Sequence, residues 1–374
     1  MIKLKSLAPA SQNLLAIALV FFAATAQAAT LVEKDGSYAK APLEKEKVVI
    51  KVVQNLTRNL QDFPNVDEGL AHNLEQMTAL TKRACSEGMK PDFILFNEFP
   101  LTGYSDGSRE EKLKFTIEIP GPESDALGKV AKECDTYIIF GSYARDEADW
   151  PGHILSLNAV IGRNGKVVEK FWKTRNIKNY GDIEIPTTTI ENVYDRYVAL
   201  YGEEALFPVL RTEYGNIAVS TVQGDTMVFA AFAMRGVEIM FRTSTLFNKL
   251  DVQATASFNN YYSAMSNITF PADSQYARGG GGSLIVSPRG QILAEDPSNN
   301  EAIIEAEVDI AALRKGRSDR GRTIPHYPMG VTRAVFDQYQ EEFPLNHLDV
   351  PIDQLPDNGA EMKVLMDKQS RWKK

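Results

Sequence analysis

The fold is decided by the stretch FILFNEFPLTGY, residues 93–104. Its first four residues, 93–96, are apolar and predict a short buried strand, and Glu98 follows where that strand ends. Open α/β sheets place their ligand clefts at the carboxyl ends of their strands. A carboxylate at that edge, between Phe96 and Phe99, is poorly solvated and can serve as a general base. The alternative is a structural glutamate that caps a helix or pairs with a cation.

The chain on both sides of this strand alternates between strands and helices. Upstream, the β-branched run at 48–53 predicts another buried strand. Between these strands, apolar residues recur every three or four positions over 67–89, which is typical of an amphipathic helix. Downstream, a helix is predicted over 123–134 and a strand over 137–140. This β-α-β-α-β order indicates an α/β protein whose helices pack on a sheet.

Two later segments resemble each other. Residues 159–170 and 284–295 each predict a strand, a turn and a second strand, with Gly165 and Gly290 in the turns. Similar hairpins in two halves of the chain indicate a pseudo-symmetric pair of sheets. Between the hairpins we expect strands at 207–211, 217–221 and 237–241 and a helix at 227–235. The glycine run at 279–282 lacks the Lys-Ser/Thr of a phosphate-binding loop, so we interpret it as a flexible entry to the second hairpin.

The first 28 residues have the features of a secretory signal peptide. Two lysines precede an apolar run over 14–24, and Ala26-Gln27-Ala28 matches a cleavage site. The run is too short for a membrane anchor, since a spanning helix needs about 20 apolar residues. We therefore expect cleavage after Ala28 and a secreted or periplasmic protein, with no membrane contact after cleavage and a polar mature segment over 29–47.

Charge and cysteine content narrow the classes of function. The chain carries 41 Lys and Arg against 49 Asp and Glu; removing Lys3 and Lys5 with the signal peptide leaves 39 against 49, a net charge of −10. This excess of acid argues against a nucleic-acid partner, because phosphate binding needs clustered positive charge. Cys85 and Cys134 either form a disulfide after export or remain buried thiols. Two Cys and four scattered His lack the spacing of a zinc site, and no cofactor is expected.

Lys173 is the second residue to which the sequence allows a chemical role. It follows the first hairpin, just past the aromatic pair Phe171-Trp172. A lysine there can extend its amine to solvent. Alternatively, a buried cation at this place can stabilise a developing oxyanion. The residues around Lys173 leave both interpretations open.

A series of motifs, all in the same order, resembles the nitrilase superfamily of carbon–nitrogen hydrolases. The stretch at 93–104 is similar to the catalytic-glutamate motif of that family, and residues 171–174 are similar to its catalytic-lysine motif. Shorter matches extend the resemblance over about residues 48–316, at 52–54, 119–123, 138–142, 207–209, 212–219, 235–239 and 306–309. The resemblance implies a nitrilase-type α-β-β-α sandwich over 48–322, followed by an extended tail over 323–374, and a homo-oligomer.

The resemblance also implies Glu-Lys-Cys chemistry. In that family a cysteine thiolate attacks the carbon of an amide or nitrile, the glutamate moves the proton, and the lysine steadies the charged intermediate. Glu98 and Lys173 occupy two of these roles, and the expected ligand is a small amide, nitrile or carboxylate. A supporting second glutamate is expected before Gly202, where the candidates are Glu184, Asp195 and, preferred to both, Glu191.

The cysteine position departs from the family pattern. Counting forward from Gly215 places Val222 there, and valine cannot act as a nucleophile. Counting back from Gly236 places Ser220 there instead. In a strand, residues two apart share one face, so Ser220 and Val222 are interchangeable by a two-residue slip. Ser220 is therefore the candidate replacement nucleophile, whereas Thr221 points the other way, into the core.

Three functions are compatible with these residues. The first is hydrolysis of small amides through an altered elbow, nearest to the amidase side of the family. The second is an exported, catalytically inactive protein that binds a small molecule with Glu98 and Lys173. The third is a structural role in subunit association. Retention of both charged residues argues against the third, because unpaired buried charges are costly. Loss of the thiol argues against amide hydrolysis by the usual cysteine mechanism of the family.

Overall fold

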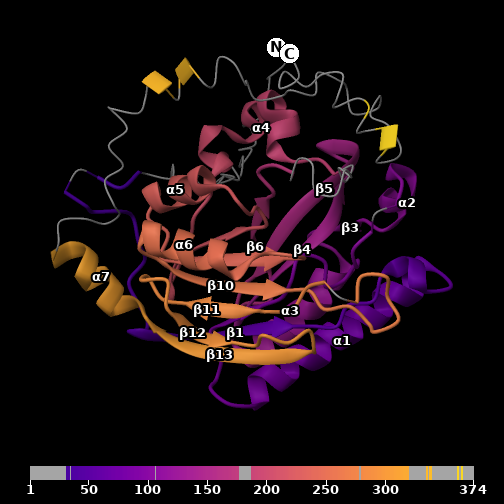
Figure 1. Ribbon diagram of the computed structural model, residues 1–374, viewed down its shortest axis with the longest axis horizontal. Coiled ribbons are helices and arrows are strands. Elements are labelled where there is room, and N and C mark those ends of the chain that lie inside the picture. The colour runs from indigo at the N-terminus through magenta and orange to yellow at the C-terminus, as the bar shows by residue number, and fades with distance from the viewer. Residues whose placement is uncertain are drawn as a thin grey trace, which may run out of the picture.

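The computed structural model describes residues 31–33, 35–105, 107–176, 187–277 and 279–319, and positions 334–335, 337–338, 360–361 and 364. The predicted signal peptide and most of the predicted tail over 323–374 lie outside the described residues. Within them, two mixed sheets stack face to face and helices cover both outer faces (Figure 1). The expected α-β-β-α sandwich is confirmed.

The first sheet combines the N-terminal half of the chain with its last strand. Its order is β13-β1-β2-β4-β5-β6, with β3 paired to β4. Its centre is parallel, and β13, β5 and β6 add to it in the antiparallel sense. The strands are β1 (Lys47–Gln54), β2 (Phe93–Leu95), β3 (Ile117–Glu118), β4 (Tyr137–Asp146), β5 (Trp150–Ile161), β6 (Val167–Trp172) and β13 (Ala302–Asp309).

The second sheet has the order β12-β11-β10-β9-β8-β7. Its central strands β8, β9 and β10 are parallel. The strands are β7 (Leu210–Thr212), β8 (Gly215–Ser220), β9 (Ile239–Ser244), β10 (Tyr262–Asn267), β11 (Leu284–Val286) and β12 (Ile292–Glu295). Both predicted hairpins are confirmed, as β5–β6 and β11–β12. The strand expected at 207–211 starts later, at Leu210, because a 3-10 turn at Glu203–Leu206 precedes it.

The outer helices divide between the two sheets. On the first sheet lie α1 (Val66–Ser86) and α3 (Pro122–Cys134), and on the second lie α5 (Thr226–Met234) and α6 (Lys249–Asn259), as Figure 1 shows. The remaining helices are η1 (Leu60–Asp62), α2 (Arg109–Lys114), η2 (Ile190–Val193), α4 (Tyr194–Tyr201), η3 (Glu203–Leu206) and α7 (Ile310–Asp319). None of the helices within the described ranges is both long and apolar enough to cross a bilayer.

The core between the sheets follows from strands that are apolar on both faces. All three residues of β2 are buried, because one face meets the helices and the other meets the second sheet. The ring of Phe93 lies 5.3 Å from the ring of Phe241 on β9, centroid to centroid. Towards the helices, Ile94 packs in a cluster with Met77 and Leu80 of α1. The predicted helix over 67–89 therefore uses its apolar face as expected.

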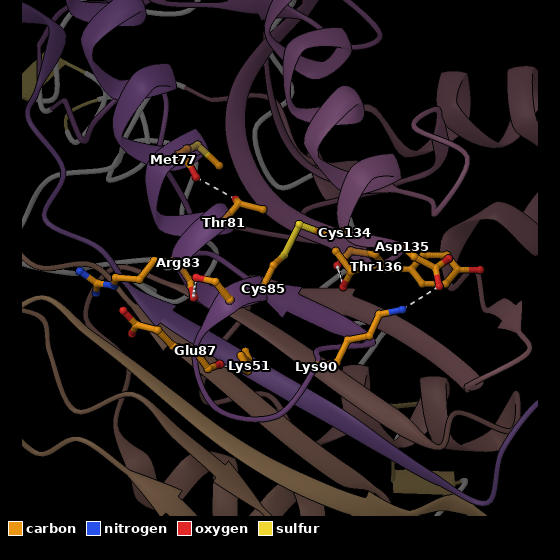
Figure 2. Close-up of a disulfide and its surroundings, with 12 residues drawn as sticks. Lys51, Met77, Thr81, Arg83, Cys85, Glu87, Lys90, Cys134, Asp135 and Thr136 are labelled. Atoms are coloured by element: carbon orange, nitrogen blue, oxygen red, sulfur yellow. Dashed lines mark hydrogen bonds and ion pairs between the residues drawn. A yellow bond between two sulfur atoms is a disulfide. The ribbon is translucent and has the colours of Figure 1, made fainter.

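A disulfide joins the two helices that cover the first sheet. Figure 2 shows Cys85 in the last turn of α1 bonded to Cys134 at the end of α3, with Cα atoms 6.0 Å apart. Of the two alternatives that the sequence left open, the structure has the disulfide. These are the only cysteines of the chain, so neither thiol is free.

The segment before β1 packs against the second sheet. The Tyr38 hydroxyl donates to Glu238 Oε1 at 2.6 Å, and the carbonyl oxygen of Ala41 accepts from Arg314 Nη1 at 2.8 Å. Arg314 also pairs with the fully buried Glu238. The polar mature segment is therefore held to the sandwich by hydrogen bonds to buried charges.

Candidate functional site

Glu98 lies just beyond the end of β2, at the carboxyl edge of the parallel strands of the first sheet. The chain stays beside β4 there, because Gly141 N donates to Asn97 O at 3.0 Å. A Cβ on Gly141 would lie 2.4 Å from the carbonyl oxygen of Glu98. Only glycine allows this approach of the two main chains. Gly141 therefore fixes where the Glu98 backbone lies.

Lys173 directly follows β6, and its main chain is held on both sides. Lys173 N donates to Ser156 O at 2.9 Å, and Lys173 O accepts from Ile190 N at 3.1 Å. Its side chain turns to Glu98, where Nζ donates to Oε1 at 3.0 Å. Lys173 is 9% exposed and Glu98 is 5% exposed. The structure thus brings together the two charged residues that the sequence singled out and buries them as a pair.

The second oxygen of Glu98 is bound from the other sheet. Thr245 follows β9, and its Oγ1 donates to Glu98 Oε2 at 2.6 Å. The buried Glu98 charge therefore has a hydrogen-bond donor on each oxygen, Lys173 from the first sheet and Thr245 from the second.

Alternation along β9 explains why Thr245 faces the glutamate. Phe241 meets Phe93 of the first sheet, and Thr243 Oγ1 donates to Asn158 Oδ1 of β5 at 2.6 Å. Since strand residues two apart share a face, Thr245 continues this row. Sequence reasoning missed Thr245, although the alternation from Phe241 onward was the signal that could have found it.

The opposite face of β9 carries a buried arginine. Arg242 is fully buried, and its Nη2 donates to Asp251 Oδ2 at 2.6 Å and to the Val222 carbonyl oxygen at 2.7 Å. Its guanidinium lies 4.0 Å from the ring centre of Phe229 on α5. Ser220 pairs with Arg242 in the parallel register of β8 and β9, so both side chains point to the α5 and α6 side.

The first residues of the elbow after β8 are buried. Val222 is fully buried, and its N–H donates to Ser220 Oγ at 3.2 Å. Among the described residues, no hydrogen bond joins Ser220 or Val222 to Glu98 or Lys173. Thr221 is buried, as expected of a residue that points away from Ser220. The structure therefore pairs Glu98 with Lys173, whereas the described hydrogen bond of Ser220 goes to the Val222 main chain.

The candidates for a second glutamate differ in position. Glu191 lies in η2, half-buried, and its N–H donates to Thr174 O at 2.9 Å, so its main chain runs beside Lys173. Asp195 is exposed in the first turn of α4. Glu184 lies outside the described residues. The preferred candidate is thus the one whose main chain is bonded next to the lysine.

His153 lies on β5, and its imidazole is neutral at pH 7. Burial, helped by the charge of Arg196, lowers the pKa of His153 to about 4. Its Nδ1 is 3.1 Å from Thr188 Oγ1, at the bridge beside β5. Within the described part of the chain, no imidazole is hydrogen-bonded to Ser220 or Thr245. A Ser-His pair is therefore not formed at this site.

The two mixed sheets stack face to face, and helices cover both outer faces. This architecture is an α-β-β-α sandwich, with a buried carboxylate–ammonium pair at its strand ends. The chain belongs to the carbon–nitrogen hydrolase family, whose profile matches residues 56–318. The resemblance read from the motifs is thereby confirmed.

Individual relatives are similar at low identity. The chain is 24% identical over 288 residues to the bifunctional nitrilase/nitrile hydratase NIT4B of Lupinus angustifolius, covering 66% of this chain and 75% of that protein. It is 25% identical over 213 residues to the omega-amidase NIT2 of Homo sapiens, covering 54% and 72%.

Solved structures share the fold. An amidase mutant from Nesterenkonia sp. AN1, with the acetamide moiety of fluoroacetamide covalently added at its active site cysteine, is 15% identical with a TM-score of 0.54, covering 79% of this chain and 99% of that one. Nit3 of Saccharomyces cerevisiae is 19% identical with a TM-score of 0.56, covering 75% and 97%. At these identities the structures establish the fold alone.

Proposed function

We propose that the protein is exported and binds a small amide, nitrile or carboxylic acid at Glu98 and Lys173, without the thiol reaction of its family. The observation that carries the proposal is the buried pair itself, with Lys173 Nζ 3.0 Å from Glu98 Oε1. A buried pair is rarely the most stable choice for a core, since apolar residues of similar volume are often as good or better. Its presence therefore favours a use in binding over a purely structural role.

The pair offers complementary groups to an amide. An ammonium has three N–H donors, and among the described contacts of Lys173 one goes to Glu98. Its remaining donors suit a carbonyl or carboxylate oxygen, while a Glu98 oxygen can accept from an amide N–H. We propose Glu191 as the supporting carboxylate beside this lysine. A small ligand with one carbonyl and one polar substituent matches this arrangement.

The loss of thiol chemistry is supported by two observations. Val222 stands at the family's cysteine position by the count from Gly215, and both cysteines of the chain form the disulfide between α1 and α3. The related Nesterenkonia amidase carries its covalent adduct on a cysteine. A thioester requires a thiolate, so this chain has no residue for that intermediate.

Export is supported by the signal-like segment over 1–28 and by the disulfide, since disulfides persist in oxidising compartments. Mass spectrometry of the protein recovered from the cell envelope or medium tests the proposal. A mature N-terminus at Ala29 is expected, and an intact Met1 on the folded protein contradicts it. We also propose a homo-oligomer, which sedimentation velocity tests directly: a single monomeric species across a wide concentration range contradicts it.

Thermal unfolding with a ligand panel tests the binding proposal. Short amides, nitriles and carboxylates are added to the mature protein, because a ligand that binds only the native state raises the melting temperature. At a concentration 100 times Kd the stabilisation is about 2.7 kcal/mol. We expect Lys173→Ala and Glu98→Ala to abolish the shift. Lys166→Ala, in the exposed turn before β6, is the matched control and should retain it.

Two results contradict the binding proposal, and a third contradicts the absence of thiol chemistry. One is a panel in which no compound raises the melting temperature. The other is a shift that survives in both Lys173→Ala and Glu98→Ala, which would place the ligand elsewhere. Ammonia release that iodoacetamide abolishes would contradict the absence of thiol chemistry.

A further inference from the structure

We propose that Thr245 is the nucleophile of this site, and that the protein transfers the acyl group of small amides or activated esters to its hydroxyl. The inference rests on the proposed binding of such ligands at Glu98 and Lys173. It assigns the attacking atom to the residue directly after β9 and not to the elbow after β8, where the family resemblance places it.

The hydrogen bonds are those of an activated hydroxyl. Thr245 Oγ1 donates to Glu98 Oε2 at 2.6 Å, and the other oxygen of Glu98 is held by Lys173 Nζ at 3.0 Å. Nucleophilic catalysis by a hydroxyl needs a base within about 2.6–3.2 Å and a third group that orients the base. Glu98 is that base and Lys173 is that orienting group. All three residues are buried to nine-tenths or more, so bulk water competes little for their hydrogen bonds.

The other hydroxyls near this edge have different partners. Ser220 lies on the α5 and α6 side of its sheet and accepts from the Val222 main chain. Thr243 donates to Asn158. Thr221 is buried and has no described hydrogen bond to Glu98. Among the described residues, Thr245 is thus the hydroxyl that the carboxylate can deprotonate.

Thr245 is also at the correct edge of the sheet. β8 and β9 pair in parallel, so the elbow after Ser220 and the turn after Ser244 leave the second sheet at the same end. Glu98 leaves the first sheet at the carboxyl end of β2. The Thr245 hydroxyl bonds across the gap to that residue. A nucleophile directly after β9 therefore needs no rearrangement of the elbow.

The reaction balances with the residues present and water. As Thr245 Oγ1 bonds to the carbonyl carbon of the amide, its proton passes to Glu98, and the oxyanion is stabilised by the Lys173 ammonium. The C–N bond then breaks, and Glu98 returns the proton to the nitrogen, so that ammonia leaves and an oxygen ester remains on Thr245. Water gives a proton to Glu98 and attacks the ester carbon. The C–O bond breaks, Thr245 regains its proton and the carboxylic acid is released.

The experiment is acyl trapping on the mature, disulfide-bonded protein with 4-nitrophenyl acetate as the probe. Rapid quenching and peptide mapping by mass spectrometry locate the acetyl group, and we expect it on Thr245. Acetylation there should be lost in Thr245→Val and Glu98→Gln and kept in Thr245→Ser, which retains the hydroxyl. Thr243→Val removes a buried hydroxyl from the same face of β9 and should leave acetylation of Thr245 unchanged. Melting temperatures establish that each variant is folded.

The outcomes separate this inference from the proposed function. Acetylation of Ser220, or of surface lysines alone, overturns the role of Thr245. If amides raise the melting temperature through Lys173 but Thr245 is not acylated, the inference fails and the binding proposal stands. If neither binding nor acylation occurs, both fail. Slow ammonia release from short amides that disappears in Thr245→Val and persists in Thr245→Ser would support it further.

Discussion

Removal of the Cys85–Cys134 disulfide should lower the free energy of unfolding by about 4 kcal/mol. The cross-link spans 49 positions of the sequence. In the chain-entropy description, closing a loop of that length removes about 14 cal/mol/K from the unfolded ensemble, which is about 4 kcal/mol at 25 °C. The bonded residues lie at the ends of α1 and α3, so their loss acts mainly through the unfolded chain.

Urea unfolding followed by circular dichroism measures this loss. The oxidised protein, the same protein with reductant, and the Cys85→Ala/Cys134→Ala variant are compared. The reduced protein and the variant should unfold at similarly lowered urea concentrations, and reductant should not affect the variant. This last comparison controls for other effects of the reductant.

Two observations would refute the reasoning. Equal free energies of unfolding with and without the cross-link would show that the loop contributes no entropy difference. Two thiols that react with a thiol reagent in the native, non-reduced protein would show that the bond does not form.

Three further perturbations test other parts of the structure. The Arg163 guanidinium lowers the pKa of Asp135 to about 2, so Arg163→Met should raise that pKa in an NMR titration. In the native protein the Asp135 carboxylate contributes stability that is present above pH about 4 and is lost as the pH falls through about 2. Gly141→Ala places a Cβ 2.4 Å from the Glu98 carbonyl oxygen, so the free energy of unfolding measured in urea should fall by about 1–3 kcal/mol. The same change should abolish ligand-induced thermal shifts. Asp251→Ala leaves the fully buried guanidinium of Arg242 without its carboxylate partner and should lower the free energy of unfolding by about 3–5 kcal/mol. Lys249→Ala removes the ion pair of an exposed lysine and should lower it by less than about 1 kcal/mol.

Strands β1, β2 and β4 of the first sheet were predictable because each contains an apolar run next to a helix with a clear period. The strand at 93–96 and the helices over 67–89 and 123–134 follow from patterning alone. Helix α6 and strand β10 were not predicted. The α6 sequence has small and polar residues among its apolar ones, and β10 reads Tyr-Ser-Ala-Met-Ser-Asn, so neither shows the usual period. Both are stabilised by tertiary burial, which a local pattern does not show.

The site was half predictable for a similar reason. Glu98 and Lys173 stand at strand ends within recognisable motifs, and the structure pairs them. Thr245 lies 147 positions from Glu98, so only the stacking of the two sheets makes them neighbours. The face of Ser220 depends on the register of β8 against β9, which sequence counting cannot fix. The sequence therefore predicts contacts within a sheet better than contacts between the two sheets.

Because Glu98 is held by one donor from each sheet, its geometry depends on the thickness of the sandwich. In the core between the sheets, the rings of Phe93 on β2 and Phe241 on β9 pack against each other and help to set the distance between the two sheets. A smaller side chain at either position would let the layers approach or tilt, and the two donors would no longer reach the carboxylate together. Substitutions in the apolar interior can therefore impair the proposed ligand binding without altering any polar atom. A survey of variants that lose the ligand-induced thermal shift should find some of them in the core.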